Sequence, residues 1–501
     1  MESELTAKVQ ALRAHEAKCA ALTHAMGVLY TDGVTVAPEE SYEGRGRTMG
    51  VLSGIEYELN TDPAVLALLD ELEACAPELD EQVRREVRVL RREADRIRKI
   101  PAEEYTEYAR LTSEAESVWI RAKNENDFSA FAPYLEKIVK ANRRMAQLWN
   151  PTEEPYNVLL DSFEEGLDMA QCEAFFTEVR SGIVPLIEKI SALGACPAEF
   201  TKKCYPVAQQ ELLSQKLMAL EGIDPKRCTL GTTEHPFTDS YNNKDVRITT
   251  HYHEEDFLSS LFSVLHEGGH ALYELGGEDR INYTCLFGGA SMGIHESQSR
   301  FYENIIGRSR AFAAPLLNAC RECFPEQLAG VTEEEFYRGV NFVKPSLIRT
   351  EADELTYPLH VMVRYEIEKQ LIAGTLEVKD VPAVWNDLYQ EYLGVCPAND
   401  AEGCLQDSHW SGGMFGYFPS YALGSAYGAQ MLTVMERDVP EMWEQTAAGD
   451  LSGVTKWLHE HIHYCSALYP PKELFEKACG RFDAKYYVNY LTEKYTKIYE
   501  V

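Results

Sequence analysis

The residues best suited to chemistry in this 501-residue chain stand together in one short segment, His266-Glu267-Gly268-Gly269-His270. Two histidines four positions apart lie on one face of a helix, where their imidazole nitrogens can bind one metal ion. The glutamate after the first histidine can then reach a water molecule on that metal. The segment therefore predicts a hydrolase with one zinc ion per chain, in which His266 and His270 bind the metal and Glu267 is the general base.

A catalytic zinc usually has three protein ligands, so the sequence must supply one more. A histidine at the sixth position after His270 would serve, but Gly276 stands there. A carboxylate from a following helix is the remaining pattern, and Glu296 lies 26 residues after His270, which leaves room for a loop and a second helix. We predict Glu296 as the third ligand, with His295 and Glu274 as the alternatives.

The residues around the motif predict the helix that carries it. Asp256 precedes apolar positions at helical spacing, which indicates a capped amphipathic helix that runs through the motif and ends near Gly276-Gly277. Glycine inside a helix costs about 1 kcal/mol relative to alanine. We therefore interpret Gly268 and Gly269 as positions that backbone or substrate approaches closely.

Helical periodicity dominates the remaining sequence, which predicts a mainly α protein. Residues 245–252 are the best strand candidate, because β-branched residues alternate there after the turn signal Asn242-Asn243. This small sheet beside the catalytic helix could hold an extended peptide. The sequence shows no linker and no repeat, so we expect one peptidase domain over residues 1–501, a single helical body with a long cleft. Within it, residues 1–150 would form lid or dimer contacts, and residues 151–501 would be the catalytic part.

Composition excludes several classes of partner. The 48 Lys+Arg against 80 Asp+Glu give a formal charge of −32, which repels nucleic acids and anionic lipids. The basic stretch 84–99 has apolar positions at helical spacing, which favours a solvated or subunit-facing helix over a nucleic-acid arm. Residues 410–435 carry no charge, but their glycines and tyrosines favour a buried segment that lines a site over a membrane span.

The thirteen cysteines favour a reducing, cytoplasmic setting, because their number is odd and their spacing is not that of a disulfide framework. Cys320 and Cys323 have redox or zinc spacing, yet no second Cys/His pair lies near them, so we expect no site there. The start of the chain shows no signal peptide.

Hydrolysis also needs donors for the oxyanion of the tetrahedral intermediate. The uncharged segment 410–435 and its flank offer His409, Tyr417 and Tyr421. We take His409 and Tyr421 as the catalytic candidates and leave Tyr417 open, because only geometry can choose among the three.

Five motifs along nearly the whole chain resemble those of the carboxypeptidase Taq family, metallocarboxypeptidases of the helical zincin type. Besides the HEGGH helix they are Asp-x-Arg-x-Thr at 245–249, His-Glu-Ser-Gln at 295–298, Ile-Arg-x-x-Ala-Asp at 348–353 and Gly-x-x-Gln-Asp-x-His-Trp at 403–410. The resemblance implies the same ligands and general base as the spacing does. It also implies a homodimer, tolerance of cobalt in place of zinc, and a long cleft. Residues 29–33 depart from the family's Trp-Asp pair, which affects lid contacts and substrate preference.

The resemblance further implies substrates with a free C-terminus, from which single residues are released. A fixed guanidinium suits the terminal carboxylate, and we predict Arg349 first and Arg247 second. For each the alternative is a structural ion pair, with Asp353 or Asp245 respectively. Two other functions stay open: an oligoendopeptidase of the same helical type, which needs no free carboxylate, and a peptide-binding protein without turnover, against which the intact Glu267 argues.

Overall fold

The structure, a computed structural model, describes residues 2–501, with side chains for all of them except residues 2, 3 and 39. As predicted, the chain is mainly helical and has one small sheet. The helices before the sheet are α1 (Glu2–Thr35), α2 (Tyr42–Thr61), α3 (Pro63–Ala74), α4 (Glu81–Arg98), α5 (Ala102–Glu125), α6 (Phe128–Trp149), α7 (Pro155–Phe163), α8 (Met169–Ala192) and α9 (Val207–Glu221).

The helices after the sheet are α10 (Phe257–Leu275), α11 (Met292–Arg300), α12 (Ala313–Cys323), α13 (Glu333–Val340), α14 (Tyr357–Ala373), α15 (Val381–Leu393), α16 (Pro419–Asp438), α17 (Met442–Ala447), α18 (Ser452–His461), α19 (Pro471–Cys479) and α20 (Lys485–Tyr499). A π-helical turn, η4 (Phe301–Ile306), continues α11 directly, and a short 3₁₀ turn, η5 (Arg349–Glu351), precedes α14.

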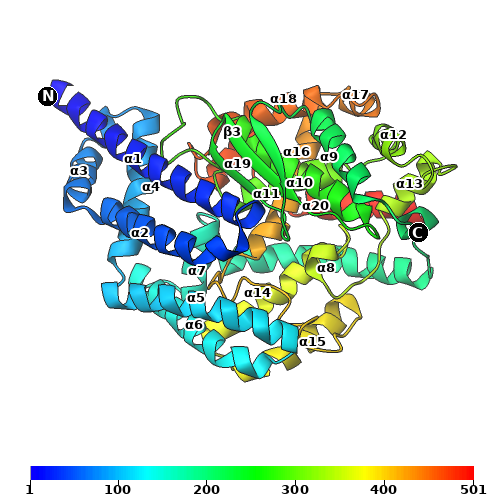
Figure 1. The fold of residues 1–501 in the computed structure, drawn as a ribbon, viewed down its shortest axis with the longest axis horizontal. Coiled ribbons are helices and arrows are strands. Elements are labelled where there is room, and N and C mark those ends of the chain that lie inside the picture. Colours follow the sequence, from blue (N-terminus) through cyan, green and yellow to red (C-terminus); the bar gives the residue numbers. More distant parts are fainter. Residues whose placement is uncertain (1) are drawn as a thin grey trace.

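The sheet has three strands, β1 (Cys228–Thr232), β2 (Thr238–Asn242) and β3 (Asp245–Thr250), in the order β1-β3-β2. β3 is parallel to β1 and antiparallel to β2, so β2 is an edge strand. The predicted strand is confirmed, although it ends at Thr250 instead of residue 252. Figure 1 shows the sheet beside α10, with α1 running past it.

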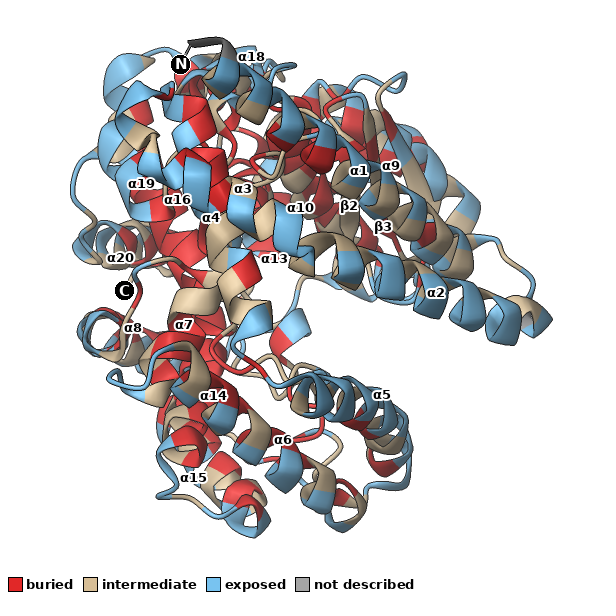
Figure 2. Cartoon of the chain, turned by 90° about the vertical axis from the view of Figure 1, so that its left-hand side faces the viewer, coloured by how far each residue is buried: buried red, intermediate tan, exposed pale blue. Residues whose placement is uncertain are grey.

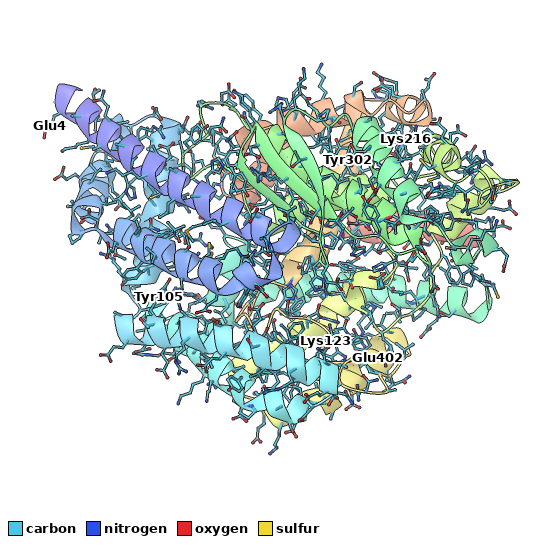
Figure 3. All side chains as sticks on the ribbon, in the orientation of Figure 1. Glu4, Tyr105, Lys123, Lys216, Tyr302 and Glu402 are labelled. Atoms are coloured by element: carbon cyan, nitrogen blue, oxygen red, sulfur yellow. The ribbon has the colours of Figure 1, made fainter. Side chains whose placement is uncertain are left out.

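The elements form two parts that face each other. In both views the sheet, α1, α2 and α10 lie on one side, and α5, α6, α14 and α15 lie on the other (Figures 1 and 2). Figure 2 shows that α14 and α16 are mostly buried, whereas α2 is mostly exposed. Tyr105 of α5 reaches α2, where its ring centre is 5.5 Å from that of Tyr57 (Figure 3).

One large apolar core runs from α5 to the C-terminal helix α20. A smaller core joins α1, α3 and α4 through Leu12, Leu69 and Val83. Most arginines of α4 contact carboxylates of the protein, for example Arg92 with Asp161 at 2.9 Å. Across residues 2–501, no helix combines the length and apolar character that a membrane crossing needs.

Candidate active site

Helix α10 begins where the sequence predicts, because the Asp256 side chain caps it by accepting a hydrogen bond from the Ser259 backbone nitrogen at 3.3 Å. The helix runs from the sheet into the core and ends at Leu275. Helix α11 returns beside it and carries Glu296. Local capping and spacing therefore bring the three predicted metal ligands onto two neighbouring helices.

The three predicted ligands meet at one point. The Glu296 Oε2 atom is 3.7 Å from His266 Nε2 and 3.6 Å from His270 Nε2, and the ligand atoms of all three lie within 4.8 Å of one another. Two zinc–ligand bonds of about 2.0–2.2 Å at a tetrahedral angle span about 3.4 Å. The donor set and its spacing thus fit one small divalent metal ion.

Hydrogen bonds behind the imidazoles fix which nitrogen is free to bind metal. His266 Nδ1 is 2.9 Å from a carboxylate oxygen of Glu303, so Nδ1 carries the proton and Nε2 has the lone pair. His295 Nε2 lies 2.7 Å from Glu274 and donates to it. The His295 Nδ1 atom therefore accepts from His270 Nδ1 at 2.6 Å, which leaves His270 Nε2 free. The two alternative ligands, His295 and Glu274, thus lie behind His270 and orient it.

A charged network supports the ligands from the far side. Arg300 donates to Glu296 Oε1 at 2.7 Å and to Glu303 Oε2 at 3.1 Å, and Arg308 donates to Glu303 at 3.1 Å. Burial alone would raise the pKa of Glu303, but the Arg300 charge and the His266 hydrogen bond outweigh it and lower this pKa to about 2. Glu303 is therefore an anion that holds the His266 proton in place.

Glu267 points to the sheet side of the same site. It is buried, and the Thr238 hydroxyl of β2 donates to its Oε2 at 2.6 Å. Burial raises the pKa of Glu267 above the usual value for a glutamate. The edge strand thus fixes the carboxylate beside the ligands, where the sequence places a general base.

The two glycines of the motif are close-approach positions, as predicted. A Cβ on Gly269 would lie 2.4 Å from the backbone oxygen of Gln298 on α11. A Cβ on Gly268 would lie 2.2 Å from a carboxylate oxygen of Glu221 on α9. Gly269 therefore lets α10 and α11 come near enough for Glu296 to reach the two histidines.

Arg349, the first choice for the substrate carboxylate, lies in the same cleft. Its guanidinium donates to Asp407 Oδ1 at 2.8 and 3.0 Å and to the Tyr357 hydroxyl at 3.1 Å. Arg364, which is fully buried, binds the other oxygen of Asp407 at 2.7 and 2.9 Å. The ion-pair partner is thus Asp407. The nearby Asp353 instead binds Thr356 and neighbouring backbone nitrogens.

Arg247, the second choice, is not brought to this site. Its guanidinium donates to both oxygens of Asp245 at 3.0 and 3.1 Å and lies over the Tyr241 ring. It is absent from the residues that line the metal cleft. The ion pair with Asp245 that the sequence offered as an alternative is present.

Among the candidate oxyanion donors, Tyr421 is the one that lines the cleft with the metal ligands. Its hydroxyl is 3.0 Å from His409 Nε2, and its ring packs 5.0 Å from that of Tyr417. Burial lowers the pKa of His409 to about 4 and raises that of Tyr421 well above its usual value. At neutral pH a neutral His409 therefore donates to or accepts from a protonated Tyr421.

The cleft has a volume of about 560 Å³ and is walled by both parts of the molecule. Sequence reasoning missed four residues that bind the predicted ones: Thr238, Glu303, Tyr357 and Asp407. The sequence could have indicated Glu303, because it follows Glu296 by seven positions, close to two helical turns, and so lies on the same face of a helix. Thr238 had none, since only the fold brings it near, whereas Asp407 lies in the motif at 403–410, which singled the residue out without indicating its partner.

The fold is mainly helical, and two histidines and one carboxylate form a possible metal site in its cleft. The Carboxypeptidase Taq (M32) metallopeptidase family matches residues 11–495. The chain is 40% identical to Carboxypeptidase 1 of Bacillus subtilis, over 95% of this chain and 96% of that one. It is 38% identical to Thermostable carboxypeptidase 1 of Pyrococcus furiosus, over the same shares.

A solved structure agrees. The M32 carboxypeptidase from Deinococcus radiodurans R1 superposes with a TM-score of 0.96 and 37% identity, covering 99% of this chain and all of that one. The chain therefore belongs to the carboxypeptidase Taq (M32) family, and it is a metallocarboxypeptidase.

Proposed function

We propose that the protein is a zinc-dependent carboxypeptidase that releases C-terminal amino acids from peptides, with Glu267 as the general base. The observation that carries the proposal is the presence of a metal-ligand set and a buried guanidinium, that of Arg349, in one cleft. Two histidines and one carboxylate around an open position are the ligands of several catalytic zinc sites.

His266, His270 and Glu296 would hold a zinc ion, which would lower the pKa of a water bound to it toward neutrality and polarise the peptide carbonyl. Glu267, fixed by Thr238, accepts the proton of the attacking water. It then passes that proton to the leaving amine.

Tyr421 is the proposed donor to the oxyanion. Its raised pKa keeps the hydroxyl protonated, and it lines the cleft beside the ligands. His409, which lies behind that hydroxyl, acts through Tyr421 by donating to its oxygen and fixing its direction. This assignment keeps both predicted residues in the reaction but gives them different roles.

Arg349 is proposed to bind the terminal carboxylate of the peptide. Asp407 accepts hydrogen bonds from Nε and Nη2 of the guanidinium, so the remaining nitrogen, Nη1, which donates to Tyr357, stays directed into the cleft. Tyr357 offers a hydroxyl at the same place, as a second donor to a carboxylate. Arg247 remains the second choice and would need a site outside this cleft.

Three finer points complete the proposal. Cobalt substitutes for zinc, because the nitrogen and oxygen donors suit both ions. The protein works in the cytoplasm, as the thirteen free cysteines favour. It forms a homodimer, with residues 1–150 supplying lid or dimer contacts.

The proposal is tested by mass spectrometry of a peptide pool incubated with protein holding stoichiometric zinc, beside C-terminally amidated copies. We expect stepwise loss from the free C-termini, while the amidated copies remain intact. Internal cuts in both sets would instead identify an oligoendopeptidase, and no cleavage with zinc bound would identify a peptide-binding protein.

A further inference from the structure

The two carboxylate oxygens of Glu296 have different partners. Oε2 is 3.7 Å from His266 Nε2 and 3.6 Å from His270 Nε2, and the Ser299 hydroxyl donates to it at 3.2 Å. Oε1 instead accepts a hydrogen bond from Arg300 Nε at 2.7 Å. The carboxylate therefore presents one oxygen to the metal position and the other to a guanidinium.

Arg300 is itself held by several contacts. Its Nη1 donates to Glu303 Oε2 at 3.1 Å, and its guanidinium carbon lies 4.1 Å from the centre of the Tyr357 ring. Tyr357 is buried, and its hydroxyl accepts a hydrogen bond from Arg349 at 3.1 Å. A guanidinium fixed by two carboxylates and an aromatic ring loses all of these contacts together if it turns away from Oε1.

Helix α16 restricts the stem of the Glu296 side chain. A Cβ on Gly424 would lie 2.6 Å from the Glu296 Cβ and 2.7 Å from its Cγ, so the backbone of α16 packs directly against this stem. The terminal torsion of a glutamate is soft, so the carboxylate can still turn about its last bond. Whether one oxygen or both face the metal position therefore depends on what binds Oε1.

We propose that Arg300 is a positioning residue that makes Glu296 bind the metal through Oε2 alone. This inference rests on the proposed function, in which His266, His270 and Glu296 hold a zinc ion. A carboxylate can bind a metal ion through one oxygen or through both. A second oxygen of Glu296 would compete for the position that a catalytic zinc keeps open for water. Arg300 thus keeps that position open without contacting the substrate.

Arg308 offers a matched comparison within the same cleft. It carries the same charge as Arg300 and also donates to Glu303, at 3.1 Å. Among the residues that the structure describes, however, its ion pair is with Glu303 and not with Glu296. A loss of charge beside the site is therefore common to both arginines, whereas the contact with Oε1 belongs to Arg300.

The test compares crystal structures of the zinc-loaded unaltered protein, Arg300→Met and Arg308→Met. We expect Oε2 alone on the zinc in the unaltered protein and in Arg308→Met, and both oxygens within bonding distance of the zinc in Arg300→Met. Both oxygens bound in the unaltered protein or in Arg308→Met, or Oε2 alone in Arg300→Met, would overturn the proposal. The unaltered protein decides the first point even where Arg300→Met does not fold.

A solution measurement separates positioning from a merely structural role. Because a positive charge beside the metal opposes cation binding, Arg300→Met should bind zinc at least as tightly as the unaltered protein in competition with a chromogenic chelator. Its kcat on a peptide with a free C-terminus should nevertheless fall about 10- to 100-fold. Weaker zinc binding would contradict the proposal, because Arg300 would then only stabilise the ligands. Failure of the proposed function looks different, since the zinc-loaded unaltered protein would itself release no terminal residue.

Discussion

Gly269→Ala tests whether the approach of α10 to α11 sets the metal site. The new Cβ would stand 2.4 Å from the Gln298 backbone oxygen and 2.7 Å from the Ser299 Cα. Ordinary contact begins at 3.4 Å, so the helices must separate by about 1 Å at this point. Both obstructing atoms are backbone, so no side chain can rotate away.

The expected cost has two parts. Overpacking costs about 1–3 kcal/mol, which the better helix propensity of alanine offsets by about 1 kcal/mol, so the protein should stay folded. A shift of about 1 Å in catalytic groups costs about 100-fold in rate. We therefore expect kcat/KM on a free peptide to fall about 100-fold, with weaker zinc binding in competition with a chromogenic chelator.

Gly46→Ala is the matched control, because a Cβ there meets nothing within 4 Å. It lies in the exposed helix α2 and should raise stability by about 0.4–1 kcal/mol without changing kcat/KM. If Gly269→Ala matched Gly46→Ala in both zinc affinity and kcat/KM, the reasoning from helix distance would be wrong.

Three further substitutions probe the surroundings of the site. Glu303→Gln removes the anion that orients His266 and should weaken zinc binding about 10- to 100-fold in chelator competition; undiminished affinity would contradict that role. Asp407→Asn leaves the buried Arg364 without its charged partner and should lower the free energy of unfolding in urea by about 3–5 kcal/mol, and a loss below about 1 kcal/mol would refute the pairing. Glu221→Met removes a buried carboxyl whose two oxygens have no partner among the described residues, and should raise stability by about 1–3 kcal/mol. Burial raises the pKa of Glu221 in the folded protein, so the unaltered protein loses stability as pH rises above the pKa of a glutamate in the unfolded chain, about 4.3. The stability gained by Glu221→Met should therefore grow from pH 5 to pH 8 in parallel urea titrations. A gain that does not change with pH would count against a buried acid at this position.

Local patterns predicted the part of the site that is contiguous in sequence. Asp256 caps α10, and helical spacing sets His266 and His270 on one face. Glu296 follows on the next helix, where a third ligand was expected. The cap and the two histidines depend on residues a few positions apart, for which helix periodicity is sufficient. Glu296 was found because a catalytic zinc usually needs a third ligand.

Long-range pairing could not be predicted in the same way. Arg349 was expected to pair, if at all, with the neighbouring Asp353, but its partner is Asp407, 58 residues away. Asp353 is used locally, where it accepts hydrogen bonds at the start of α14. Nearness in sequence indicates a partner only where the backbone keeps the two residues together, as β3 does for Arg247 and Asp245.

The packing of the first helices on the sheet had no sequence signal either. Helical periodicity predicted a mainly α protein, yet the contact of α1 with β2 depends on side chains some 200 residues apart. The Thr31 hydroxyl donates to Asp239 at 3.2 Å, and His24 stacks on Tyr241 with ring centres 4.5 Å apart. Both contacts need the tertiary fold before they can form.

The most direct test of the catalytic assignment is to measure zinc content and peptide hydrolysis on the same sample of Glu267→Gln protein. The amide keeps the shape of the side chain and can still meet Thr238, but it cannot accept the proton of water. We expect one zinc per chain and a loss of hydrolysis of at least about 100-fold on peptides with a free C-terminus. Undiminished hydrolysis with zinc bound would contradict the assignment of Glu267 as the general base.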